Sequence, residues 1–163
     1  MCAKSLRNKY LENLSRPAKR NFLNSLSDDD AEFLLKDWYR YARDEQIAPE
    51  GAWRICLFLG GRGAGKTRSG AEWIAEGVAN EEMCRIGLIG ATYDDTRAIM
   101  IEGESGLLKV SRGASFEPSN RRIKWPNGAI ATVLSADEPD SLRGHRFDAL
   151  WLDGDRAPKK TSH

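Results

Sequence analysis

The feature that most constrains this chain is a glycine-rich stretch between an apolar run and an amphipathic run. Residues 60–67, Gly60-Gly61-Arg62-Gly63-Ala64-Gly65-Lys66-Thr67, match the spacing G-x-x-x-x-G-K-[ST]. Glycines let the backbone turn tightly, so that its N–H groups can approach a polyphosphate. At this spacing Lys66 can reach the β- and γ-phosphates, and the Thr67 hydroxyl can hold a Mg²⁺ ion. The stretch therefore predicts a phosphate-binding loop.

The residues on either side of the loop fit this prediction. Residues 55–59, ICLFL, form a short continuous apolar run, which is typical of a strand buried on both faces of a parallel sheet. After the loop, the spacing i, i+3, i+4, i+7 predicts one apolar helix face made by Ala71, Ile74, Ala75 and Val78. This order aims a helix N-terminus at a bound anion. We therefore expect a nucleotide site rather than a glycine-rich turn without a ligand.

A later apolar run supplies an acidic side chain. Residues 147–153, FDALWLD, predict a strand that ends in Asp153. Strands of a parallel sheet bring such an aspartate to the carboxyl edge, beside the phosphates, where it can join Thr67 in holding Mg²⁺. Many strands end in aspartate, so this pattern gains its meaning from following the phosphate loop.

Other segments predict the remaining elements. We expect a helix that starts near Ser27 and continues through residue 43, and a buried strand at residues 86–91. A helix at residues 93–101 capped by Thr92 or Asp94 follows, and then a hairpin at residues 121–134 around Asn127-Gly128. The basic residues of the first hairpin strand either touch DNA phosphates or keep an edge strand soluble; they are Arg121, Arg122 and Lys124. The expected organisation is an N-terminal helical segment (1–50), a core (51–153) and a polar tail (154–163).

Composition sets the class of protein. The 163 residues are 40% hydrophobic and 30% charged with a net charge of +1, which fits one globular domain without global basicity. The three cysteines show no C-x-x-C spacing, so neither disulfides nor a zinc site is indicated. No apolar run approaches the roughly 18–20 residues that span a bilayer. We expect a cytoplasmic protein with no membrane contact.

Three longer stretches resemble the large subunit of tailed-phage terminase, in particular its prophage and gene-transfer-agent members. They are GGRGAGKTRSGAEWIAEG, IGLIGATYDDTRAIMIEGESGLL and SFEPSNRRIKWPNGAIATVLSADEPDSLRGHRFDALWLD. The resemblance covers roughly residues 30 to 153. It implies an ATPase that drives double-stranded DNA into capsids, working as a homo-oligomeric ring with a portal and a small terminase subunit. The implied fold is α/β, a P-loop NTPase core of the ASCE type with a parallel sheet, a hairpin insertion and an N-terminal helical segment.

The resemblance also implies roles for single residues, with ATP and Mg²⁺ as ligands. Lys66, Thr67 and Asp153 match the phosphate-loop lysine, the hydroxyl on the Mg²⁺ side and the Mg²⁺-associated aspartate. Arg62 matches an arginine that acts in cis on the γ-phosphate. Arg143 lies where the family places an arginine acting on a neighbouring subunit's nucleotide, although a surface salt bridge is the alternative. Gln46 falls near the family's adenine-contacting glutamine, or is a solvated linker residue.

The sequence departs from the family directly after Asp153. Family members carry a glutamate there, the base that polarises the attacking water, and this chain has Gly154. The resemblance stops at the tail GDRAPKKTSH, as a frameshift would produce, before the later ATPase strands and the nuclease domain. We therefore expect very weak hydrolysis and no nuclease activity. The alternatives are another P-loop enzyme such as a kinase, and an inactive nucleotide-binding remnant or interaction module.

Overall fold

The computed structural model describes residues 14–28, 30 and 37–154. The chain divides into two units, residues 1–47 and residues 48–163, which are described separately. The first unit contains the α-helices α2 (Arg16–Asn24) and α4 (Trp38–Tyr41) and the 3₁₀ helix η1 (Asp44–Gln46). The Ser27 hydroxyl accepts from the Asp30 N–H at 3.1 Å, as expected where a helix starts. Residues 31–36 of that predicted helix lie outside the described residues. The prediction of one helix through residue 43 is wrong, because the backbone is extended at Asp37 and α4 begins only after it.

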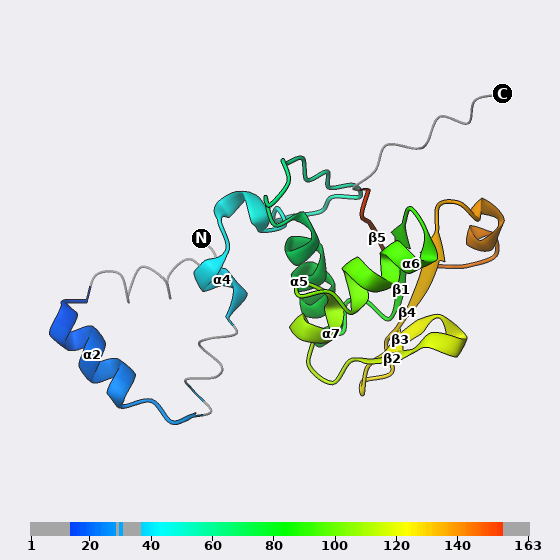
Figure 1. Cartoon of the computed structure of the whole chain (residues 1–163). Helices are drawn as coiled ribbons and strands as arrows, with labels where there is room; N and C mark the ends of the chain where they lie inside the picture. Colours follow the sequence, from blue (N-terminus) through cyan, green and yellow to red (C-terminus); the bar gives the residue numbers. More distant parts are fainter. Residues whose placement is uncertain (1–13, 29, 31–36, 155–163) are drawn as a thin grey trace. The chain divides into compact units, whose positions relative to one another are not determined.

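The second unit is built on a five-stranded mixed sheet with strand order β2-β3-β4-β1-β5 (Figure 1). The strand β1 (Arg85–Gly90) lies between β4 (Ile130–Ser135) and β5 (Ala149–Leu152) and is parallel to both. The strand β3 (Arg122–Lys124) pairs antiparallel with β4, and β2 (Ser115–Glu117) pairs antiparallel with β3. The predicted strands at residues 86–91 and 147–153 are thus confirmed as members of one sheet.

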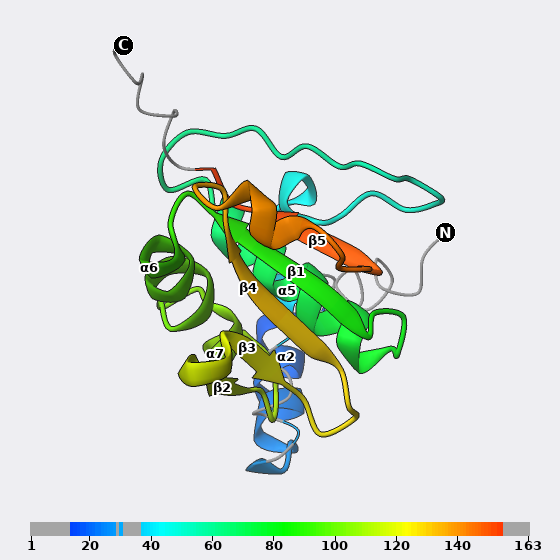
Figure 2. The same cartoon turned by 90° about the vertical axis from the view of Figure 1, so that its right-hand side faces the viewer.

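The helix α5 (Lys66–Ala79) packs on one face of this sheet, behind the strands as Figure 2 shows them. Its apolar stripe is buried as the spacing predicts, with Ala71, Ile74 and Val78 at most 2% exposed and Ala75 half-buried. These side chains join Ile86 and Leu88 of β1, among others, in one core. Burial of a continuous stripe against a sheet fixes the direction of the helix, and with it the position of its first residue.

The segment after β1 follows the predicted helix with an irregularity. The short helix α6 (Tyr93–Asp95) starts at Thr92, whose hydroxyl accepts from the Asp95 N–H at 3.0 Å. A π-helical stretch, η2 (Thr96–Ile101), continues it. The Thr96 side chain is fully buried and donates to the carbonyl oxygens of Thr92 and Leu134, which satisfies its hydroxyl inside the core. Three short helical pieces complete the unit: α7 (Leu107–Val110), η3 (Pro118–Asn120) and η4 (Pro139–Leu142).

The predicted hairpin is confirmed as β3 and β4, joined by a turn that contains Asn127. The Asn127 Nδ2 donates to the carbonyl oxygen of Val78 at 2.8 Å, which ties this turn to the C-terminal end of α5. Of the two alternatives for the basic first strand, the edge strand is wrong, because β2 pairs on its outer side. Lys124 pairs there with Glu117 at 2.7 Å. The short strand β2 has no clear pattern in the sequence.

The predicted strand at residues 55–59 is not part of the sheet. This segment has no strand pairing, and Ile55, Leu57 and Leu59 are 88%, 76% and 78% exposed. The expectation of a strand buried on both faces is therefore wrong for this chain. An apolar run forms a buried strand only where neighbouring strands pair with its two edges, and no described strand pairs with either edge of this run.

No described strand pairs with the outer edge of β5 either. It is the last strand in the sheet order, and its side chains alternate between buried and exposed. Ala149 and Trp151 are buried, whereas Leu150 and Leu152 are 46% and 66% exposed. Among the described residues, no helix is long and apolar enough to cross a membrane.

Candidate functional site

The glycine-rich stretch forms a tight loop that leads directly into α5. Gly63 and Gly65 have φ angles of 79° and 81°, in the left-handed region that favours glycine. The Ala64 N–H donates to the Gly61 carbonyl oxygen at 3.2 Å, which closes the turn. Gly65 is the cap residue of the helix, so Lys66 and Thr67 occupy its first turn. The unpaired N–H groups at the N-terminus of this 14-residue helix therefore face the loop.

The Lys66 side chain folds back over this loop. Its Nζ donates to the carbonyl oxygens of Gly60 and Gly61, each at 3.1 Å. The ammonium group therefore stands at the mouth of the loop rather than extending into solvent. A phosphate group in the loop would offer Nζ a charged acceptor, and charge-assisted hydrogen bonds are roughly twice as strong as neutral ones.

Thr67 and Asp153 meet although they are 86 positions apart in the sequence. The Thr67 hydroxyl donates to Oδ2 of Asp153 at 2.8 Å, in partly buried surroundings. Asp153 follows β5 directly, and its N–H donates to the Ile89 carbonyl oxygen at 3.0 Å, which extends the pairing with β1. The sheet thus places this carboxylate at the first turn of α5.

The chemistry of these two groups fits Mg²⁺. A hydroxyl and a carboxylate supply hard oxygen ligands, and Mg²⁺ is commonly bound by one or two protein groups together with waters and substrate phosphates. Among the described residues, no group of three or more His, Cys, Asp or Glu could hold a metal. The donor set therefore suits a metal that arrives with a polyphosphate better than a metal enclosed by protein ligands.

The first turn of α5 contains no acidic residue of its own, so the positive end of the helix dipole faces the loop. The carboxylate that lies beside this turn, Asp153, accepts a hydrogen bond from Thr67. Arg68, the third residue of the helix, pairs with Glu72 one turn further along at 2.7 Å. Burial raises the pKa of Glu72, and the hydrogen bond and charge of Arg68 oppose that rise. The nearest acid on the helix is thus partly neutralised by its own partner.

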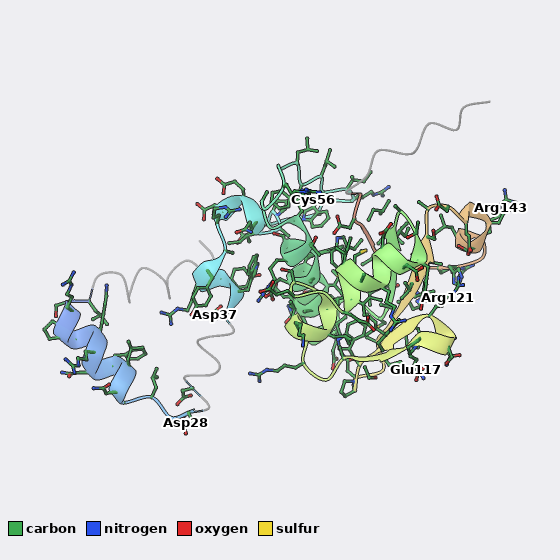
Figure 3. All side chains as sticks on the ribbon, in the orientation of Figure 1. Asp28, Asp37, Cys56, Glu117, Arg121 and Arg143 are labelled. Carbon is green, nitrogen blue, oxygen red and sulfur yellow. The ribbon has the colours of Figure 1, made fainter. Side chains whose placement is uncertain are left out.

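The other predicted site residues are more scattered. Arg62 is exposed on the loop. Arg143 follows η4 and pairs with Asp140 at 3.4 Å, with 85% of its side chain exposed; Figure 3 shows it at the tip of its loop, away from α5. Gln46 belongs to the first unit, where its Oε1 accepts from the Arg43 N–H at 3.0 Å. The structure therefore brings together Lys66, Thr67 and Asp153, but neither arginine joins their hydrogen bonds.

The position after Asp153 offers no general base. Gly154 is exposed, and a Cβ built on it would meet no atom within 4 Å. Glycine therefore stands there without a packing reason, and a larger side chain would fit.

Sequence reasoning missed a close contact that holds the site together. A Cβ on Gly70 of α5 would lie 2.2 Å from the Trp151 ring, so this side chain of β5 packs directly against the backbone of the helix. A glycine within an amphipathic helix pattern was the available signal, since it costs helix stability unless packing requires it. This contact sets how close the start of α5 lies to Asp153.

A separate hollow of about 410 Å³ lies at the other end of the sheet. It is lined by Arg85 and Ile130, the first residues of β1 and β4, and by the loop before β5, including His145 and Phe147. The amino ends of parallel strands face away from the edge at which Asp153 lies. This hollow therefore includes neither the glycine-rich loop nor Asp153.

A comparison with protein families identifies the class. A family model described as terminase large subunit, T4likevirus-type, N-terminal, matches residues 57–160. The chain belongs to this family, and the match includes both the glycine-rich loop and Asp153. Comparisons with curated proteins and with solved structures find no match.

Proposed function

We propose that this chain binds ATP with Mg²⁺ as the ATPase part of a terminase large subunit, on a P-loop NTPase core. The hydrogen bond between the Thr67 hydroxyl and the Asp153 carboxylate carries this proposal. It joins the loop to a later strand at the point where a triphosphate and its metal would lie. A glycine-rich turn without a ligand gives no reason for such a pairing.

Each residue has a distinct task in this proposal. The N–H groups of the loop and of the first turn of α5 bind the phosphates, and Lys66 neutralises the β- and γ-phosphates. Thr67 and Asp153 hold the metal, whose bound form neutralises charge on the phosphate oxygens. Arg62 approaches the γ-phosphate from the loop itself, and Arg143, exposed on its own loop, acts on the nucleotide of a neighbouring subunit.

Hydrolysis in this chain should be very weak. Water attack needs a base positioned to orient the water and accept its proton, and Gly154 has no side chain to do so. The proposal is therefore tight ATP–Mg²⁺ binding combined with turnover well below the usual ~1–10³ s⁻¹ of enzymes. Double-stranded DNA, the portal and the small terminase subunit are the proposed partners, and a ring of copies is the proposed assembly.

Nucleotide titration of the full chain tests this function. We expect saturable ATP binding that requires Mg²⁺, lost in Lys66→Ala and reduced about tenfold or more in Thr67→Val and Asp153→Asn, because each removes one charged or metal-holding group. Lys109→Ala, which removes an exposed lysine on α7, is the matched control and should bind ATP like the wild type. Equal affinity in Lys66→Ala and in the wild type would refute the proposal.

A second candidate function is a nucleotide-dependent interaction module that does not turn over. Gly154 favours it, because the base is absent. Single-turnover measurement with the full chain separates the two. Any ATP hydrolysis lost in Lys66→Ala supports a weak enzyme, whereas binding without product supports the module.

A further inference from the structure

The hollow of about 410 Å³ at the amino ends of β1 and β4 takes no part in the proposed ATP site. Its volume falls within the range of about 300–1,000 Å³ that sites for small ligands occupy. Aromatic rings and arginine side chains both line it. We propose that this hollow binds one nucleotide, whose base stacks on the rings and whose phosphate pairs with the arginines.

The aromatic part of the lining is a stacked pair of rings. His145 and Phe147, two positions apart in the loop before β5, have ring centroids 5.3 Å apart and ring planes 17° from parallel. Gly144 comes directly before them with a φ angle of 83°, and a Cβ built on it would meet no atom within 4 Å. A nucleobase can extend such a stack, because every base has a planar π face.

The arginines supply the charge for a phosphate. The Arg85 guanidinium donates to Oδ1 of Asp148 at 2.9 Å, and Oδ2 of this carboxylate accepts from the backbone N–H groups of Cys84 and Arg85. Asp148 therefore holds the guanidinium in place while using one of its five N–H donors, so that others remain for a ligand. Arg146 is exposed and has no ion pair among the described residues. Arginine binds phosphate oxygens through two parallel hydrogen bonds.

The combination of rings and arginines determines the class of ligand. The described residues that line the hollow include no acid, and they add the hydroxyl of half-buried Thr132, which can bond to a sugar. An inorganic anion would leave the rings unused, and an uncharged aromatic molecule would desolvate the arginines without giving them a partner. A nucleotide with one phosphate contacts the rings, the arginines and the hydroxyl together.

This second site is separate from the glycine-rich loop. Arg85 is the first residue of β1, whereas Asp153 binds the Ile89 carbonyl oxygen near the other end of this strand. The six residues of β1 span roughly 17 Å at about 3.3 Å per residue. Binding in the hollow therefore needs neither Lys66 nor a metal held by Thr67, and it can be measured whether or not the loop binds ATP.

Amide chemical shifts of the full ¹⁵N-labelled chain test the site. The probe is 2′-deoxyadenosine 5′-monophosphate (dAMP), added with EDTA so that no Mg²⁺ supports binding at the loop. We expect saturable shifts at residues 85–86 and 144–147, and none at residues 60–67. Deoxyadenosine and inorganic phosphate should each bind about tenfold or more weakly than dAMP, because each lacks one half of the ligand.

A single strand of eight deoxyadenosines distinguishes two sources of the nucleotide. Tighter binding per nucleotide than dAMP would support the site and assign its ligand to an unpaired strand. Equal or weaker binding per nucleotide would support it as a site for free mononucleotide. A duplex keeps its bases inside the stack, where the rings cannot reach them. Equal shifts from the duplex of the same sequence would therefore overturn the proposal.

Variants of exposed residues complete the test. Arg146→Gln and His145→Ala should each weaken dAMP binding about tenfold or more, since one removes a charge and the other half of the ring stack. Arg112→Gln, at an exposed arginine outside the hollow, is the matched control and should bind like the wild type, as should Lys66→Ala. The proposal is overturned by an absence of shifts at the hollow, by wild-type affinity in Arg146→Gln, or by loss of dAMP binding in Lys66→Ala.

Discussion

Two apolar runs of similar composition have opposite fates in this molecule. Residues 86–90, IGLIG, form a central strand whose side chains are buried, whereas residues 55–59, ICLFL, lie unpaired and exposed. The first run has β4 on one edge and β5 on the other. The second run has no strand on either edge within the described part of the chain. A hydrophobic sequence therefore makes a segment able to form a buried strand. Whether it does so depends on the presence of neighbouring strands that pair with its edges.

The largest expected difference is in the free energy of unfolding, when one leucine from each run is replaced by alanine. Leu88→Ala should lower the free energy of unfolding by about 2–5 kcal/mol, because it leaves a cavity in the core. Leu57→Ala should change it by no more than about 0.5 kcal/mol, since its side chain is already in water. Urea unfolding of both variants measures the difference. Equal losses would mean that residues 55–59 are buried in solution.

The next effect concerns how closely the helix packs on the open side of the sheet. Gly70→Ala should cost about 1–3 kcal/mol, because its methyl group would overlap the Trp151 ring and the clash outweighs the about 1 kcal/mol that alanine gains in a helix. Gly87→Ala is the matched control. Its methyl group would meet the end of the half-exposed Leu150 side chain, which can rotate away, so its loss should be smaller. Thermal or urea unfolding compares the two.

A smaller loss of stability is expected at the turn between β3 and β4, which is hydrogen-bonded to the C-terminal end of α5. Asn127→Ala removes the bond to the Val78 carbonyl oxygen and should cost about 0.5–1.5 kcal/mol. Asn120→Ala, which removes an exposed bond to Glu117, should cost less because water replaces that bond. A loss in Asn120→Ala as large as that in Asn127→Ala would contradict the role of the Asn127 contact.

The smallest effect is a pH dependence at the start of β5. Hydrogen bonds from the Arg85 guanidinium and from the backbone N–H groups of Arg85 and Cys84 lower the pKa of Asp148 below its ordinary value of 3.8. Stability from a lowered acid pKa is present above the ordinary value and is lost as pH falls through the folded one. Asp148→Asn should therefore flatten the fall of the thermal midpoint below about pH 4. An unchanged fall of the thermal midpoint with pH would show that Asp148 does not contribute to this pH dependence.

Local patterns predicted much of the fold. The apolar stripe of α5, the Thr92 cap and the Asn127 turn were readable because each depends on residues close in sequence. The meeting of Thr67 with Asp153 was expected from the order of strands and loop, and the resemblance named the same pair. Their proximity follows from parallel strands that share one edge.

Other features depended on distant partners and were not readable. The exposure of residues 55–59 reflects strands that are not beside them, and β2 is too short to show a period. The contact of Gly70 with Trp151 depends on a helix and a strand whose separation no local pattern encodes. The placement of Arg143 depends on a loop, and loops follow turn chemistry rather than periodicity.

The direct contact between the Gly70 backbone and the Trp151 ring has a mechanical consequence. Gly70 has no side chain that could rotate, and Trp151 is only 8% exposed, so close packing transmits a movement of one element to the other. A displacement of α5 as its first turn closes on a ligand would carry β5 along, and β1 with it through their ladder. A movement that begins at the glycine-rich loop would then displace the sheet as a whole.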